Sequence, residues 1–155
     1  MTSVTSVDRG DRVVARQVTV NAPAEELFAQ VADPHRHGEI DGSGTVKDTV
    51  KGPTTLSQGA KFSVGMKQFG VPYRITSTVT EFTDTADNKV IEWQHPLGHK
   101  WRWEFVASTP TSTEVTESFV YGTAKIPKML EMTKQTAQNA NGITKTLEKL
   151  AQRYS

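Results

Sequence analysis

The chain has 155 residues, no cysteine, and 18 basic against 17 acidic residues, which gives a formal net charge of +1. This length fits one domain, the lack of cysteine excludes disulfides and thiol chemistry, and the balanced charge argues against binding to nucleic acid or anionic membranes. No apolar run reaches the roughly 18 residues that span a bilayer, and the first residues do not form a secretory signal. We therefore expect a cytoplasmic protein, a monomer or weak homodimer, with residues 1–10 as a disordered tail and residues 11–155 as a single domain.

The first forty residues indicate one strand followed by two short helices. Apolar and polar residues alternate over Arg12–Val20, which is typical of a strand. Pro23 suits the start of a helix, where its missing N–H costs nothing, and Asp33 before a proline suits its end. A second helical turn is predicted over His35–Glu39.

Further along the chain, short alternating segments are separated by turn residues, which predicts a meandering antiparallel sheet. These segments are Thr45–Lys51, Lys61–Phe69, Tyr73–Phe82, Asn88–His95, Trp101–Phe105 and Thr111–Tyr121. The loops between them are too short for the crossovers that parallel strands need.

The last thirty residues predict one continuous amphipathic helix. From Lys125 to Tyr154, apolar and small residues recur every three or four positions. At about 1.5 Å per residue, this helix would be about 40 Å long. The fold class is therefore α+β: a curved seven-stranded antiparallel sheet wrapped around a long C-terminal helix, with two short helices after the first strand.

Three local motifs carry a family resemblance. They are Val20–Phe28 with Val31–Pro34, then His37–Gly44, and Trp101-Arg102-Trp103. Together with the order of elements, they resemble the START-like superfamily, also called the Bet v 1-like or helix-grip fold, and its bacterial polyketide cyclase/dehydrase branch (SRPBCC). The resemblance covers about Arg12 to Tyr154 and implies a ligand cavity inside the grip. It does not imply one activity, because the superfamily includes both carriers and enzymes.

If the chain adopts the helix-grip fold, we expect the sheet and the C-terminal helix to form a concave wall of aromatic, methionine and aliphatic side chains. Such a wall suits an apolar ligand. The expected ligand-binding residues are Phe62, Val64, Met66, Tyr73, Ile75, Trp93, His95, Trp101, Trp103, Phe105, Phe119, Tyr121, Met129 and Met132. One alternative is an ordinary packed core. Another is a face assignment that is wrong by one residue, which would turn every side chain of a strand to the other face.

Three polar residues, Glu117, His95 and Tyr73, are the candidates for catalysis. Glu117 falls between Val115 and Phe119 on an otherwise apolar face, where burial would raise its pKa and suit it to general acid–base chemistry. The alternative, which the sequence favours, is a bulge or register break that sends Glu117 to water. His95 either bonds a ligand oxygen near the cavity mouth or lies in water at a hairpin end.

The sequence predicts neither a metal site nor a cofactor. His35 and His37 diverge on a helix, no cysteine is available as a ligand, and no phosphate-binding or dinucleotide-binding motif is present. The expected function is binding of a hydrophobic small molecule, such as a lipid, a polyketide or an aromatic metabolite, as a carrier or sensor. The alternatives are a cyclase or dehydratase that pairs Glu117 with His95 or Tyr73, and a protein-interaction module that uses the outer sheet face.

Overall fold

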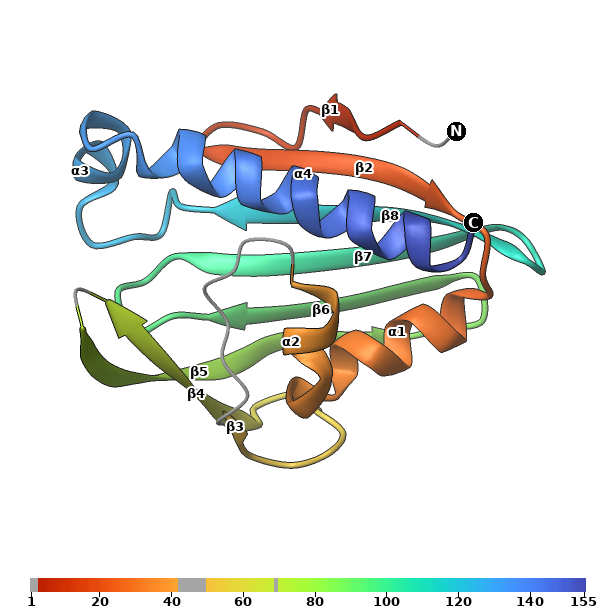
Figure 1. Ribbon diagram of the computed structural model, residues 1–155, viewed down its shortest axis with the longest axis horizontal. Coiled ribbons are helices and arrows are strands. Elements are labelled where there is room, and N and C mark those ends of the chain that lie inside the picture. Colours follow the sequence, from red (N-terminus) through yellow and green to blue (C-terminus); the bar gives the residue numbers. More distant parts are fainter. Residues whose placement is uncertain (1–2, 42–49, 69) are drawn as a thin grey trace.

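The computed structural model describes residues 3–41, 50–68 and 70–155 of the chain. Helices lie on the concave side of an eight-stranded antiparallel sheet with the order β1-β2-β8-β7-β6-β5-β4-β3 (Figure 1). The strands are β1 (Thr5–Val7), β2 (Val13–Val20), β3 (Val50–Lys51), β4 (Lys61–Gln68), β5 (Val71–Asp84), β6 (Asn88–Gln94), β7 (Lys100–Thr109) and β8 (Ser112–Val120). The helices are α1 (Ala24–Ala32), α2 (His37–Ile40), α3 (Pro127–Met132) and α4 (Gln135–Arg153), and a 3₁₀ turn over Pro34–Arg36 precedes α2. The expected α+β helix-grip architecture is confirmed.

The sheet has eight strands rather than the expected seven. The additional strand, β1, lies within residues 1–10, the segment expected to be a disordered tail, and pairs antiparallel with β2. Just beyond β1, Arg9 forms an ion pair of 3.2 Å with Glu104 on β7, which ties this segment to the outer face. Of the strand expected over Thr45–Lys51, only Val50–Lys51 lies within the described residues, and it forms β3.

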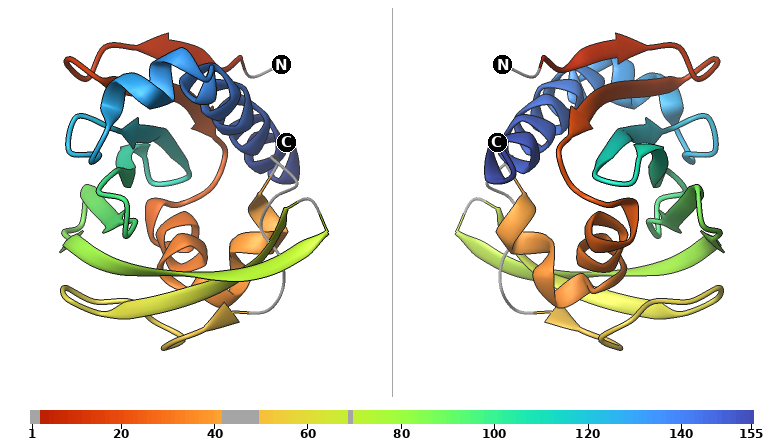
Figure 2. Two further views of the ribbon diagram at one scale, coloured as in Figure 1. Left: turned by 90° about the vertical axis from the view of Figure 1, so that its left-hand side faces the viewer. Right: turned by 90° about the vertical axis from the view of Figure 1, so that its right-hand side faces the viewer.

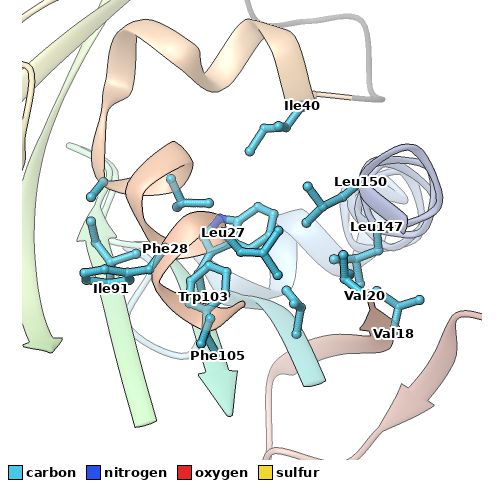
Figure 3. Close-up of a cluster of buried hydrophobic side chains, with 14 of the residues drawn as sticks. Val18, Val20, Leu27, Phe28, Ile40, Ile91, Trp103, Phe105, Leu147 and Leu150 are labelled. Atoms are coloured by element: carbon cyan, nitrogen blue, oxygen red, sulfur yellow. The ribbon is translucent and has the colours of Figure 1, made fainter. Parts of the chain in front are cut away.

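One end of the concave face is closed by α1, which packs against β6 and β7 (Figure 1). Its apolar face, Leu27, Phe28 and Val31, is buried, as expected from the spacing of these residues. The ring of Phe28 meets the ring of Phe105 edge-on at 5.8 Å and that of Phe82 at 5.2 Å. This end of the molecule is therefore a packed aromatic core (Figure 3).

The other cover of the concave face is α4, which lies across β2 and β8 (Figures 1 and 2). Its buried stripe includes Ile143, Leu147 and Leu150, and these side chains join Val18 and Val20 of β2 in the core (Figure 3). With 19 residues, α4 is about 28 Å long at 1.5 Å per residue. Seen end-on, the sheet curves around this helix, so the grip is formed by the sheet and α4 together (Figure 2).

The expectation of one continuous C-terminal helix is wrong, because the helix breaks between α3 and α4. Lys134 has a φ of 62°, a left-handed conformation that no residue inside an α-helix adopts. Just before it, the Thr133 hydroxyl donates to the Met129 carbonyl oxygen at 2.7 Å, a local bond that competes with helix continuation. The apolar stripe runs through the break at helical spacing, so periodicity alone did not reveal it.

The break allows a test of backbone strain. We expect Lys134→Gly to raise the free energy of unfolding by roughly 0.5–1 kcal/mol, because glycine adopts a positive φ without steric cost. Lys128→Gly, in the regular backbone of α3, is the matched control and should lower it by up to about 1 kcal/mol. Urea unfolding followed by circular dichroism measures both, and destabilisation by Lys134→Gly would show that this conformation is not strained.

Candidate functional site

Side chains on the concave face form cross-strand rows whose burial decreases with distance from α1. Three successive rows contain Val18 with Val115 and Phe105, then Glu117 with Trp103 and Ile91, and then Phe119 with Trp101 and Trp93. The residues named in the first two rows are buried, and Arg16 and Phe82, which end the Glu117 row, are partly buried. In the third row, Trp101 and Trp93 are themselves only partly buried. The interior is therefore filled near α1 and incompletely covered toward the β6–β7 loop.

Most of the expected lining residues lie on this concave face, with different degrees of burial. The buried ones are Phe62, Trp103, Phe105, Phe119 and Tyr121. The partly buried ones are Val64, Ile75, Trp93, His95 and Trp101. The side chain of Met66 lies outside the part of the chain that the structure describes. Phe105 belongs to the packed core under α1, so it does not line the incompletely covered region.

Three expected lining residues are exposed instead. Tyr73 is 39% exposed near the free end of the β4–β5 hairpin, and Met129 and Met132 are 53% and 82% exposed on α3. The break at Lys134 explains the two methionines, because Leu130 is the α3 residue that packs against the core. Tyr121 remains inside, but its hydroxyl donates to the Glu131 carboxylate of α3 at 2.7 Å.

Glu117 faces the interior and is 8% exposed, so the favoured expectation that a bulge turns it to water is wrong. Its pairing with β2 and β7 is continuous on both sides, which holds its side chain on the same face as Val115 and Phe119. Its Oε1 atom is buried and has no hydrogen-bond partner among the described residues. Burial, and then the negative charge of Asp41, raise the pKa of Glu117 well above its ordinary value. Burial in these surroundings therefore favours the protonated, neutral form of the carboxyl.

A second buried titratable group, His37 of α2, faces the same interior, and the sequence analysis did not identify it as a site residue. Its ring stacks on Trp93 at a centroid distance of 5.0 Å and meets Phe62 edge-on at 5.7 Å. Burial lowers the pKa of His37, so the ring is neutral. Its Nε2 lies 2.7 Å from the Val31 carbonyl oxygen, which only accepts, so Nε2 carries the proton and Nδ1 keeps a lone pair. The signal in the sequence was the three-residue spacing of Pro34, His37 and Ile40, all of which are buried.

The histidines of the β6–β7 loop form a pair at the less covered end. The rings of His95 and His99 stack at 4.2 Å, and that of His99 meets Phe119 at 5.2 Å. Burial lowers the pKa of His95, and burial followed by the charge of His95 lowers that of His99 to about 4. His95 also borders an open depression of about 500 Å³, lined in part by Lys61 and Gln94, which point away from the concave face. This depression lies outside the grip.

The two acid–base pairs expected from the sequence are not assembled. No hydrogen bond within the described residues joins Glu117 to His95 or Tyr73. The row of Glu117 ends at Phe82 of β5, and Tyr73 lies about 30 Å along β5 from that residue at about 3.3 Å per residue. The buried group that shares an electrostatic neighbour with Glu117 is His37, because the Asp41 charge acts on both.

Two further features of the described residues bear on function. Over 3–41, 50–68 and 70–155, no three His, Asp or Glu side chains gather closely enough to hold a metal ion. In the same part of the chain, no helix combines the length and apolar character needed to cross a membrane. On the outer sheet face, Arg102 bonds Glu81 at 2.8 Å and Glu92 at 3.1 Å, so this face carries an ion-pair network rather than an apolar patch.

Comparison with known proteins places this geometry in context. The family model described as "Polyketide cyclase / dehydrase and lipid transport" matches residues 11–155. The uncharacterized protein Rv0088 of Mycobacterium tuberculosis is 53% identical over 159 residues, covering 100% of this chain and 70% of that protein. The crystal structure of the hypothetical protein jhp0584 from Helicobacter pylori has a TM-score of 0.69 at 13% identity, covering 94% of this chain and 89% of that one. A norcoclaurine synthase mutant from Thalictrum, solved with a transition-state analogue, has a TM-score of 0.53 at 16% identity, covering 96% of this chain and 97% of that one. The two structures share the fold.

The burial of Glu117 makes the stability of the protein depend on pH. The folded state holds a proton that the unfolded chain loses near pH 4.5, so wild-type stability should fall as the pH rises from there through the raised pKa. The side chain at position 117 does not titrate in Glu117→Gln. The free energy of unfolding of this variant should therefore exceed that of the wild type by a margin that grows as the pH rises, by up to about 1.4 kcal/mol per pH unit.

Urea unfolding between pH 4 and 8 measures this margin. Glu148→Gln, an exposed change on α4, is the control and should leave the pH dependence of stability unchanged. Parallel stability curves for the wild type and Glu117→Gln would mean that Glu117 is ionised in the folded state.

Proposed function

Because the chain belongs to the polyketide cyclase/dehydrase and lipid-transport family, we propose that its interior binds a hydrophobic small molecule, such as a lipid, a polyketide or an aromatic metabolite, as a carrier or sensor. The observation that carries this proposal is the gradient of burial along the concave face. Large aromatic side chains at one end are packed to completion, whereas Trp93 and Trp101 of the third row are only partly covered. Such side chains gain free energy when an apolar ligand covers them.

The size of this gain is sufficient for binding. At about 25 cal/mol per Å², covering roughly 300 Å² of apolar ligand surface contributes about 7 kcal/mol before the cost of ordering the ligand is subtracted. Aromatic faces suit planar or chain-like apolar ligands, because they offer large contact areas with little loss of conformational entropy.

The N-terminal half of α4 supports the same proposal from the opposite side. Thr136, Asn139 and Ala140 are partly buried, whereas Ile143 and Leu147, further along the same face of the helix, are fully buried. The helix therefore shows the same gradient as the sheet that it faces. A ligand between the partly buried parts of both would complete the burial of the interior.

An enzyme of the cyclase or dehydratase type is the second candidate function. It is favoured by Glu117, a buried carboxyl with a raised pKa, because a protonated acid inside an apolar site is suited to proton transfer. In this alternative its counterpart is His37, whose neutral ring carries a lone pair on Nδ1. Neither His95 nor Tyr73 lies where it would serve that role.

A filling mutation tests whether ligands bind between α4 and the sheet. We expect Ala140→Trp to weaken binding of the neutral fluorescent probe N-phenyl-1-naphthylamine at least about tenfold, which corresponds to about 1.4 kcal/mol, because the indole would occupy the ligand's space. Ala137→Trp places the same side chain on the exposed face of α4 and is the matched control, with an expected change below about twofold.

The measurement is probe fluorescence titrated against each variant, with native mass spectrometry of the protein purified from its own host to search for a co-purified small molecule. The proposal fails if the wild type does not bind the probe. It also fails if the two tryptophan variants bind the probe equally well.

A further inference from the structure

The most unusual group in the interior is the Glu117 carboxyl, because the described part of the chain offers its Oε1 no hydrogen-bond partner. This oxygen is buried, and the residue is 8% exposed in the middle of β8. Its neighbours along β8, Val115 and Phe119, and Trp103 across on β7 are apolar, whereas its partner across on β2 is Arg16. A buried polar group without a partner costs stability, and such groups in native proteins call for a functional explanation.

Within residues 3–41, 50–68 and 70–155, no cation forms an ion pair with this carboxyl. The nearest candidate is Arg16 of β2, which pairs with Glu117 across the sheet and starts from the same face. Its guanidinium turns toward the edge strand, where it donates to the Ser6 hydroxyl at 3.2 Å and to the Ala15 carbonyl oxygen at 2.9 Å. On the side of α2, the titratable groups are Asp41, whose negative charge raises the pKa of Glu117, and His37, whose own pKa is lowered by burial. From α4, Ile143 and Leu147 face the interior.

These surroundings determine what the carboxyl does toward a ligand. An ionised Glu117 would lie next to aromatic rings and under the influence of a second carboxylate, so the neutral, protonated form is the stable one. A protonated carboxyl donates one strong hydrogen bond through its O–H. The complementary group on a ligand is an uncharged acceptor such as a ketone, quinone or ester carbonyl.

We propose that Glu117 is the polar anchor of the interior and donates a hydrogen bond from its protonated carboxyl to the carbonyl oxygen of a neutral, largely apolar ligand. This inference rests on the proposed function and narrows it to one ligand chemistry. The position of the anchor supports this inference, because Glu117 is buried in the row directly beside the row in which Trp101 and Trp93 are partly covered. A ligand that covers the two tryptophans has the carboxyl at its inner end.

Three probes of similar shape distinguish the contribution of a carbonyl group to binding from that of the apolar ring system. They are 2-acetylnaphthalene, which carries a carbonyl, 2-isopropylnaphthalene, which has no polar atom, and 1-(2-naphthyl)ethylamine, which is a cation at neutral pH. Their dissociation constants are measured at pH 7 by quenching of tryptophan fluorescence for the wild type, Glu117→Gln and Glu117→Leu. The leucine variant removes the donor and fills a similar volume, whereas glutamine keeps an N–H donor and removes the titration.

We expect the wild type to bind 2-acetylnaphthalene about tenfold more tightly than 2-isopropylnaphthalene. Glu117→Leu should lose this preference while binding the hydrocarbon within about twofold of the wild type, and Glu117→Gln should retain a preference of at least about threefold. If the probes bind, the inference alone is overturned when the wild type shows no preference for the ketone over the hydrocarbon, or when Glu117→Leu keeps that preference. It is also overturned if the amine binds more tightly than the ketone. Absence of binding by all three probes would instead reject the proposed function, and the inference with it.

A spectroscopic readout separates an anchoring role from a structural one. Difference infrared spectra of the wild type should show the protonated carboxyl stretch of Glu117 and the ketone stretch of 2-acetylnaphthalene both moving to lower frequency when the complex forms. The carboxyl band should be missing from the same spectrum of Glu117→Gln. A ketone stretch at the frequency measured in hydrocarbon solvent would contradict the proposed hydrogen bond.

Discussion

The structure depends on one geometric constraint, which is that a strongly curved sheet has a concave face larger than its helices cover. α1 covers this face over β6 and β7, and α4 covers it over β2 and β8. Between and beyond them, toward the β6–β7 loop, inward-facing tryptophans remain partly uncovered. A sheet of this kind needs one side buried to be stable, so incomplete cover on that side is a cost that a simple packed core would avoid.

The packed end of the molecule supplies the stability that permits this arrangement. Phe28 of α1 packs its ring against Phe105 and Phe82 of the sheet. The Leu147 and Leu150 side chains are fully buried under α4 (Figure 3). Because these contacts do not involve the third and later rows, the less covered end is free to accept a ligand without disturbing the core. The division of one interior into a packed part and an uncovered part is what makes the grip suitable for binding.

Most of the fold followed from local patterns in the sequence. Alternation predicted the strands because one sheet face is buried and the other carries polar side chains, as in the ion pairs around Arg102. The spacing of apolar residues also predicted that the end of the chain is helical, but it did not predict the break, since the left-handed backbone at Lys134 leaves the stripe uninterrupted. β1 was missed because three residues at an edge produce almost no periodic signal.

The site was less accessible from the sequence, because burial depends on contacts between distant segments. Glu117 was placed on the correct face by alternation, yet a bulge was favoured because a lone carboxylate inside an apolar wall is unfavourable. The expectation of a bulge assumed that a carboxylate avoids an apolar interior. Glu117 does not follow this rule, because its side chain is buried. His37 was overlooked because its burial comes from stacking on Trp93, which belongs to a strand that follows much later in the chain. Both errors occurred at polar residues inside the grip, where local preference and the final environment disagree.

The distinction between a carrier and an enzyme then depends on the second buried group rather than on Glu117. A carrier needs only one polar anchor, and the proposed hydrogen bond from Glu117 would supply it. An enzyme needs a base as well as an acid, and His37 has the lone pair for that role on Nδ1, since its Nε2 proton is committed to the Val31 carbonyl oxygen. The ring, however, lies stacked on Trp93 at 5.0 Å, so a substrate would have to meet the edge of the imidazole rather than its face. Catalysis is therefore possible only for a ligand that reaches from the Glu117 row to the edge of His37, whereas binding needs only the first of these contacts.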